Sequence, residues 1–108
     1  MKTVKRIYLS GPITGVKDYH QRFERAKVSL MAAGYSEIIN PAELDAVMAG
    51  AKYEEYMSLC MSLLDLSDLI VLLPGWERSL GANREFGYAL GKDKLIFELN
   101  DLLEVANG

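Results

Sequence analysis

Cysteine and histidine are nearly absent from this chain, which has one of each, Cys60 and His20, among 108 residues. A single cysteine excludes a disulfide within the chain and fits a reducing compartment, so we expect a cytoplasmic protein. The sequence also shows no cluster of residues with the spacing of metal ligands. The sequence therefore predicts a protein with no metal site and no other cofactor.

Basic residues and long apolar runs are scarce as well. Lys and Arg number 12 against 15 Asp and Glu, which gives a formal net charge of −3. Proteins that bind nucleic acid through its phosphates are normally basic, so nucleic acid is not an expected partner. No apolar run approaches the roughly 20 residues that a membrane helix needs. The short run that ends at Gly11 and Pro12 predicts a first strand rather than a signal peptide, and no membrane partner is expected.

Strand and helix patterns alternate along the chain. Half of the residues are hydrophobic, which is enough for a core, and we expect a single domain over residues 1–108. Short apolar runs predict strands, and apolar positions three and four residues apart predict amphipathic helices. The expected strands are Arg6–Ser10, Glu37–Ile39, Leu69–Leu73 and Lys94–Leu99. The expected helices are a stripe from Tyr19 to Ala33, Tyr53–Leu66 and Ala82–Leu90, with a short helix or turn over 42–50 and a terminal helical turn or tail over 101–108.

This alternation predicts an α/β fold, a three-layer flavodoxin- or Rossmann-like sandwich around a small parallel sheet of about four to five strands. The run Leu69–Leu73 is apolar on both faces, as a buried parallel strand requires. Asp18 followed by Gln21 has the form of a capping box at the start of the first helix. In open α/β sheets, ligands bind outside the carboxyl ends of the strands, so a site is expected in the segments that follow them.

The segment "SGPITG", residues 10–15, follows the first expected strand. Its glycines expose backbone N–H groups ahead of a helix, and such a turn can hold a phosphate or a sugar hydroxyl. Gly11 and Gly15 are four apart, so this is not the G-x-G-x-x-G dinucleotide fingerprint. An ordinary strand-to-helix loop is the alternative interpretation.

Glu85 lies within the first turn or two of the helix that follows the buried strand. A carboxylate near a helix N-terminus is kept ionised by the helix dipole, and an ionised, immobile acid can act as a nucleophile. The alternative is that acids are simply favoured in first turns. Tyr8, two residues before the end of the first strand, either packs in the core or points its hydroxyl into the same site.

Four other residues are less informative. Two of them have both a structural and a functional interpretation, and two have a structural interpretation only. Ser79 is a candidate N-cap, a candidate phosphate contact, or both. Trp76 either stacks on a base or covers the sheet edge. His20 is interpreted as a solvated first-turn residue, and Cys60 as a small buried hydrophobe.

Three segments, "IYLSGPITG", "NPAEL" and "SDLIVLLPGWERSLGANREFGYALGK", resemble the nucleoside 2-deoxyribosyltransferase-like superfamily. The resemblance runs from about residue 6 to residue 97, and the long third segment is its specific part. The match is best to a bacterial and phage branch with the signature LPGWE-S-GA--E. The resemblance implies cleavage or transfer of the N-glycosidic bond of 2′-deoxyribonucleosides or their 5′-monophosphates.

The resemblance also implies roles for particular residues. Glu85 falls on the glutamate that attacks the anomeric carbon of deoxyribose, and Tyr8 on a tyrosine that orients it. Ser79, six residues before Glu85, falls where the nucleotide hydrolases bind a 5′-phosphate and the transferases carry an aspartate for the 5′-hydroxyl. A hydroxyl donates to phosphate and a carboxylate repels it, which favours nucleotides. The expected substrate-binding residues are Ser10, Gly11, Pro12, Ile13, Gly15, Asn40, Trp76, Ser79 and Gly81.

Two departures from the superfamily pattern leave the function open. The hydrolases carry an arginine in the first loop, whereas here the nearest cation is Lys17. The superfamily's aspartate on the second main helix, which helps to protonate the departing base, is replaced by Cys60. A non-catalytic nucleotide-binding module, or an interaction domain without a small ligand, is therefore an alternative function. Relatives form dimers or larger assemblies, so we expect a homo-oligomer with Tyr53, Tyr56 and Met57 on its contact face.

Overall fold

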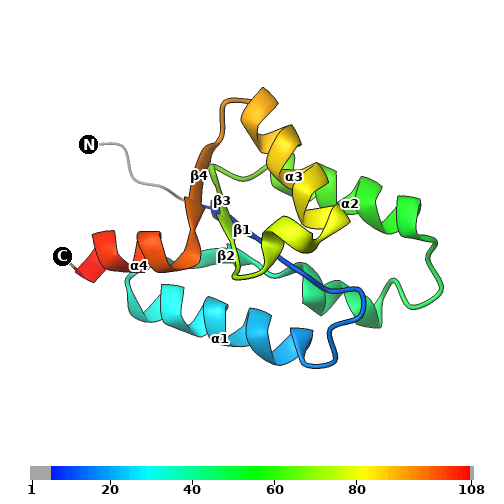
Figure 1. The fold of residues 1–108 in the computed structure, drawn as a ribbon, viewed down its shortest axis with the longest axis horizontal. Helices are drawn as coiled ribbons and strands as arrows, with labels where there is room; N and C mark the ends of the chain where they lie inside the picture. The colour runs from blue at the N-terminus through cyan, green and yellow to red at the C-terminus, as the bar shows by residue number, and fades with distance from the viewer. Residues whose placement is uncertain (1–5, 108) are drawn as a thin grey trace.

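The computed structural model describes residues 6–107, which form an α/β fold around a four-stranded parallel sheet. The order of the strands is β2-β1-β3-β4, so the flavodoxin- or Rossmann-like prediction is confirmed. Figure 1 shows the sheet between two helical layers. The elements are β1 (Arg6–Ser10), α1 (Tyr19–Ala32), β2 (Glu37–Ile39), η1 (Pro41–Ala46, a 3-10 helix), α2 (Tyr53–Asp65), β3 (Leu69–Leu72), η2 (Trp76–Arg78, a 3-10 helix), α3 (Leu80–Gly91), β4 (Leu95–Glu98) and α4 (Leu99–Asn107).

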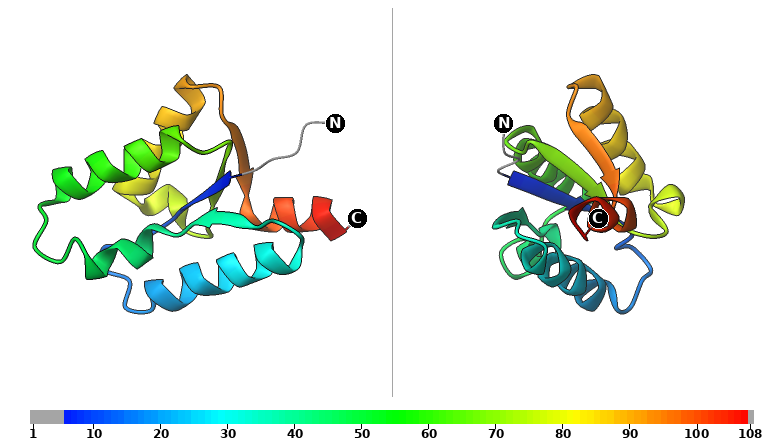
Figure 2. Two further views of the ribbon diagram at one scale, coloured as in Figure 1. Left: turned by 180° about the vertical axis from the view of Figure 1, so that it is seen from behind. Right: turned by 90° about the vertical axis from the view of Figure 1, so that its left-hand side faces the viewer.

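Each face of the sheet has its own hydrophobic core. Alternate residues of a strand point to opposite faces, so Ile7 and Leu9 of β1 pack towards α1 and α4, while Tyr8 packs towards α2 and α3. The two views in Figure 2 show α1 and α4 on one side of the sheet and α2 and α3 on the other. The polar Ser10 shares the face of Tyr8, and both are fully buried. Two polar groups of β1 are thereby directed under the helical pair α2–α3.

The central strand β3 is buried along its whole length, as its apolar sequence predicts. Most element boundaries agree with the sequence-based ranges within two residues. Residues 99–107 form a complete helix, α4, rather than a turn, and Leu102 anchors it in the core. Among residues 6–107, no helix is long and apolar enough to span a bilayer.

The predicted capping box at Asp18 is wrong. The Asp18 side chain makes no hydrogen bond to the first turn of α1, and the backbone there has φ −102° and ψ 27° rather than an extended conformation. Its carboxylate instead pairs with the Arg22 guanidinium at 2.9 Å, one turn along the helix. In this conformation the carboxylate lies beside the helix instead of over its free N–H groups, which leaves those groups uncapped by a side chain.

The carboxyl ends of β1 and β3 approach each other closely. A Cβ atom on Gly11 would lie 2.9 Å from the Leu73 Cβ, so only glycine fits there. The Leu73 N–H donates a 2.8 Å hydrogen bond to the Ser10 carbonyl and continues the pairing past the end of both strands. Gly75, with φ +88°, then turns the chain back towards α3. The loops after the two central strands therefore lie together at one edge of the sheet.

Candidate functional site

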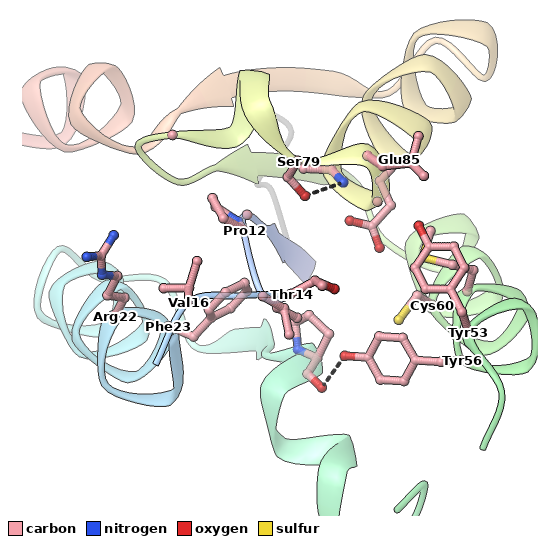
Figure 3. A pocket seen from close by; sticks show the side chains of 18 of the residues that line it. Pro12, Thr14, Val16, Arg22, Phe23, Tyr53, Tyr56, Cys60, Ser79 and Glu85 are labelled. Carbon is pink, nitrogen blue, oxygen red and sulfur yellow. Dashed lines mark hydrogen bonds between the residues drawn. The ribbon is translucent and has the colours of Figure 1, made fainter. Parts of the chain in front are cut away.

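A cavity of about 910 Å³ opens at the carboxyl ends of β1 and β3. Its wall combines the loop after β1, the segment from β3 to the start of α3, η1 and one face of α2. Figure 3 shows the labelled side chains converging on this space from α1, α2 and α3. This volume is in the range of small-molecule sites, and the position is the one that open α/β sheets use for ligands.

The Glu85 carboxylate lies in the wall of this cavity and is held by two hydroxyl groups. Tyr8 donates a 2.6 Å hydrogen bond to Oε2, and Ser10 donates a 2.6 Å hydrogen bond to Oε1. Only 6% of Glu85 is exposed. Both donors come from alternate positions of β1, so the strand period of two residues places them side by side under α3. The carboxylate is thus fixed in position, with one donor on each oxygen.

Burial and hydrogen bonds from β1 act in opposite directions on the pKa of Glu85. Ser79 caps α3, so Glu85 lies in its second turn and beyond the reach of the dipole effect. Burial raises the pKa of Glu85, and hydrogen bonds from Ser10 and Tyr8, together with the Arg84 charge, lower it again. The helix N-terminus, expected to keep this acid ionised, is therefore one turn further away than the expectation requires, and the two hydroxyl donors do most to favour the ionised form.

A thiol and two phenols surround the carboxylate. Cys60 is fully buried by its neighbours, and burial raises the pKa of its thiol to about 11, while hydrogen bonding with Tyr8 and Tyr56 lowers it. Burial, followed by the charge of Glu85, raises the pKa of Tyr8 well above its ordinary value. Burial also raises the pKa of Tyr56, whose hydroxyl donates a 3.0 Å hydrogen bond to the Pro41 carbonyl. These groups are protonated donors at neutral pH.

A second part of the wall offers hydrogen-bond donors. The Ser79 hydroxyl accepts the Ala82 N–H at 3.1 Å, which confirms its N-cap role and leaves its own hydrogen for a ligand. The turn after β1 closes through a 3.1 Å hydrogen bond from Val16 N–H to the Ile13 carbonyl. Within residues 6–107, the N–H groups of Ile13 and Thr14 have no acceptor. Arg78, beside Ser79, adds a guanidinium group with no acidic partner in the described chain.

The predicted site residues divide into three groups. Those in the cavity wall are Gly11, Pro12, Ile13, Ser79, Gly81 and Glu85. Tyr8 and Ser10 lie beneath the wall and reach it through Glu85. Gly15, Asn40 and Trp76 lie outside the wall.

Each of these three outer residues has a local structural role. Gly15 is exposed and adopts φ +79° in the turn after β1. Asn40 accepts the Ala42 N–H at 3.0 Å and caps η1. The Trp76 ring packs on Phe86 with centroids 5.0 Å apart and against the core on the α2–α3 face of the sheet, so the structure supports a packing role.

The cavity wall also contains polar residues that the sequence analysis missed, namely Arg22, Asp45, Tyr56 and Arg78. Arg78 directly precedes Ser79 in the sequence. A basic residue next to the expected phosphate contact could have been predicted to bind the phosphate. Asp45 had no such signal, because it belongs to a segment interpreted only as a short helix or turn. Among the described residues, no group of three or more His, Cys, Asp or Glu side chains could hold a metal ion.

The raised pKa of Glu85 predicts a pH dependence of stability. The folded state binds this proton more tightly than the unfolded state, so the contribution of Glu85 to the free energy of unfolding is complete below the ordinary pKa of 4.5. It is lost as the pH rises through the folded-state value; each unit by which a pKa is raised corresponds to about 1.4 kcal/mol. We expect the wild type to lose more unfolding free energy between pH 5 and pH 8 than Glu85→Gln, as measured by urea denaturation. An equal loss in both proteins would contradict the raised pKa.

Comparison with known proteins places the chain in a family but gives no activity. Among curated proteins, no significant match is found. One family model, described as "Domain of unknown function (DUF4406)", matches residues 5–97. The match includes β1, the loop after it, Ser79 and Glu85, and therefore the elements that build the cavity. The chain thus belongs to the DUF4406 family of domains of unknown function.

Proposed function

We propose that this protein cleaves or transfers the N-glycosidic bond of 2′-deoxyribonucleosides or their 5′-monophosphates, with Glu85 as the nucleophile. The observation that carries the proposal is the Glu85 carboxylate itself. It lies almost fully buried in the wall of a cavity of about 910 Å³ and is held by Tyr8 and Ser10 at 2.6 Å each. A buried acid that makes no salt bridge within the described residues is costly for folding, which favours a catalytic role.

The reaction follows from this arrangement. A Glu85 oxygen forms a bond to the anomeric carbon of the sugar, and the bond from that carbon to the base nitrogen breaks. The electron pair of the broken bond leaves with the base, which takes up a proton from solvent water. Water or a second base then attacks the glycosyl ester and frees Glu85. Deoxyribose lacks a 2′-hydroxyl and bears the developing positive charge more easily, so deoxy substrates are preferred over ribo substrates.

The donors around Ser79 support a nucleotide as the substrate. A phosphate carries charge and several acceptor oxygens, and this part of the wall provides the Ser79 hydroxyl, the Ile13 and Thr14 amides and the Arg78 guanidinium. Arg78 takes the place of the cation that the first loop lacks. Hydrogen bonds from charged or oriented donors to phosphate are among the stronger ones in proteins.

A non-catalytic nucleotide-binding module is the second candidate function, and Cys60 is the observation that favours it. Cys60 lies in the wall beside Glu85, where the resemblance implies an aspartate. A thiol whose pKa is raised to about 11 by burial is a poor acid for a departing base. The same cavity would then bind a nucleotide without breaking it.

One experiment separates these two functions. The protein is incubated with the four deoxynucleosides, their 5′-monophosphates and the matching ribonucleotides, and free base is measured by chromatography. Thermal stabilisation by each compound is measured in parallel; at 100 times the dissociation constant it amounts to about 2.7 kcal/mol. Base release from deoxy compounds supports the enzyme, and stabilisation without release supports the binding module. Neither effect from any compound rejects both.

We also expect a homodimer or a larger homo-oligomer in the cytoplasm, where the buried free thiol of Cys60 stays reduced. The expected contact face is smaller than the sequence analysis suggested, because Met57 is buried and Tyr56 is half-buried at the cavity. Tyr53 and Leu80 remain exposed by 43% and 71% beside the cavity mouth. Light scattering at micromolar concentration should show a mass of at least twice 12.0 kDa. A monomer at that concentration would contradict the expectation.

A further inference from the structure

A second anchored carboxylate, Asp45 of η1, lies in the cavity wall. The Tyr19 hydroxyl donates a hydrogen bond to Asp45 Oδ2, and the His20 Nε2 atom lies 2.7 Å from the same oxygen. A carboxylate oxygen only accepts, so the His20 ring donates from Nε2. Asp45 is thus joined to the start of α1 by two donors from residues that are adjacent in the sequence. His20 was interpreted as a solvated residue, and the structure gives it this partner.

Asp45 and Glu85 belong to different sides of the cavity. Glu85 comes from α3, whereas Asp45 comes from η1, which follows β2 on the other side of β1. In Figure 3, η1 lies below the cavity, and Ser79 and Glu85 lie above it. Tyr56 lies near both carboxylates. Burial and Cys60 raise its pKa most, and the charges of Asp45 and Glu85 raise it further. A ligand that reaches Glu85 can therefore extend towards Asp45.

One oxygen of Asp45 remains free for a ligand. Both donors bind Oδ2, and within residues 6–107 Oδ1 has no hydrogen-bond partner. The hydrogen bond to Asp45 raises the pKa of Tyr19 to about 12, so this phenol stays protonated and keeps donating. The Asp45 side chain is 36% exposed, which leaves it accessible from the cavity. The structure thus presents an acceptor that is fixed in place and has an unused oxygen.

We propose that Asp45 binds the base of the substrate, with Oδ1 accepting a hydrogen bond from an N–H group on the edge of the base remote from the sugar. This inference rests on the proposed function, which places the sugar at Glu85 and the phosphate at Ser79 and Arg78. The base is then the part of the ligand directed towards η1. Tyr19 and His20 are positioning residues, because they hold the carboxylate and do not line the cavity.

The arrangement has a consequence for selectivity. A carboxylate acceptor favours bases with N–H donors at that edge, such as the guanine N1–H and amino group, and makes no hydrogen bond to a sugar phosphate that lacks a base and binds in the proposed orientation. It also repels a phosphate, so it opposes binding of the nucleotide in the reverse orientation. Asp45 therefore contributes to recognition of the base and to the direction of binding.

The test compares 2′-deoxyguanosine 5′-monophosphate with 2-deoxyribose 5-phosphate, which is the same ligand without a base. Both are titrated calorimetrically into proteins that carry Glu85→Gln, so that the nucleotide is not consumed. Adding Asp45→Asn should weaken binding of the nucleotide about 10- to 100-fold, the range for losing a hydrogen bond to a charged group. Binding of the sugar phosphate should remain unchanged. Asp101→Asn, an exposed position on α4 away from the cavity, is the matched control and should change neither.

Tyr19→Phe supplies a second variant that keeps the ring and removes only the donor. It should weaken binding of the nucleotide by a smaller factor than Asp45→Asn does, and it should leave binding of the sugar phosphate unchanged. A general loss of structure would weaken binding of both ligands. Equal affinities of the Asp45→Asn and parent proteins for the nucleotide would overturn the inference and leave the proposed function intact. Equal weakening of both ligands would also overturn it. If neither ligand binds to the Glu85→Gln parent or to the wild type, the proposed function itself is rejected.

Discussion

Glu85→Ala should reduce the release of free base from a deoxynucleotide by at least about 10³-fold, while the stabilisation of the fold by the same ligand remains. Removal of a residue that acts only in the transition state lowers the rate and spares ground-state binding. Under the proposed mechanism Glu85 acts in this way, and its carboxylate is anchored by Tyr8 and Ser10 without a salt-bridge partner in the described chain. Chromatography of the free base and thermal unfolding with and without ligand measure the two effects.

Two further variants make this test specific. Glu85→Gln has the same size and retains an acceptor for one hydroxyl donor, so it separates loss of the nucleophile from loss of packing. Glu104→Ala, on the exposed face of α4, removes an acid outside the cavity and should leave the rate unchanged. Wild-type base release by Glu85→Ala would show that the proposed mechanism is wrong. Loss of ligand stabilisation together with activity would assign Glu85 to binding instead.

Ser79→Asp should reverse the order of affinities for nucleosides and their 5′-monophosphates. In the wild type we expect the monophosphate to bind more tightly, because the Ser79 oxygen accepts from the Ala82 N–H and its own hydrogen is left to donate to the phosphate. A carboxylate at the same position repels the phosphate dianion, and two unit charges about 4 Å apart cost roughly 4 kcal/mol near a protein surface. The ratio of the two affinities should change by at least about 100-fold, as measured by titration of both ligands.

The cap of α3 makes Ser79 a suitable position for this substitution. Asp is as good an N-cap as Ser, so the hydrogen bond to Ala82 N–H and the start of the helix are expected to persist. Ser79→Asn caps the helix without charge and serves as the matched control, with the monophosphate still preferred. If both ligands bind equally well before and after Ser79→Asp, the phosphate contact at this position is excluded.

Local patterns in the sequence were sufficient for the fold class and for the neighbourhood of the site. The spacing of apolar residues indicates which face of an element is buried, and this spacing can be read from residues close in the chain. It predicted β3 from its apolar run and α1 and α2 from their apolar stripes. Their alternation implies parallel strands with a common carboxyl edge, so Glu85, Ser79 and the loop after β1 were expected together. The period of two in a strand also puts Tyr8 and Ser10 on one face of β1, and their common partner was not evident from spacing.

Local patterns were insufficient where a side chain had more than one partner within reach. Asp18 and Gln21 match the capping box, but Arg22 is available one turn away and takes the carboxylate. Trp76 follows a buried strand at the rim of the site, but Phe86 on α3 offers an apolar surface that the indole covers. In both places, the position of the side chain depends on a residue outside the motif, so the motif alone could not predict it.

The sequence by itself therefore determined the α/β architecture and the segments that surround the cavity, because hydrophobic period and turn residues act over short stretches of chain. Only the tertiary structure decided which polar groups meet. Glu85 receives hydrogen bonds from residues 77 and 75 positions away, and Asp45 from residues 26 and 25 positions away. Such contacts depend on how the helices pack on the two faces of the sheet. The pKa of Glu85 depends on the same packing, because burial under α3 raises it and the two hydroxyl groups of β1 oppose that effect.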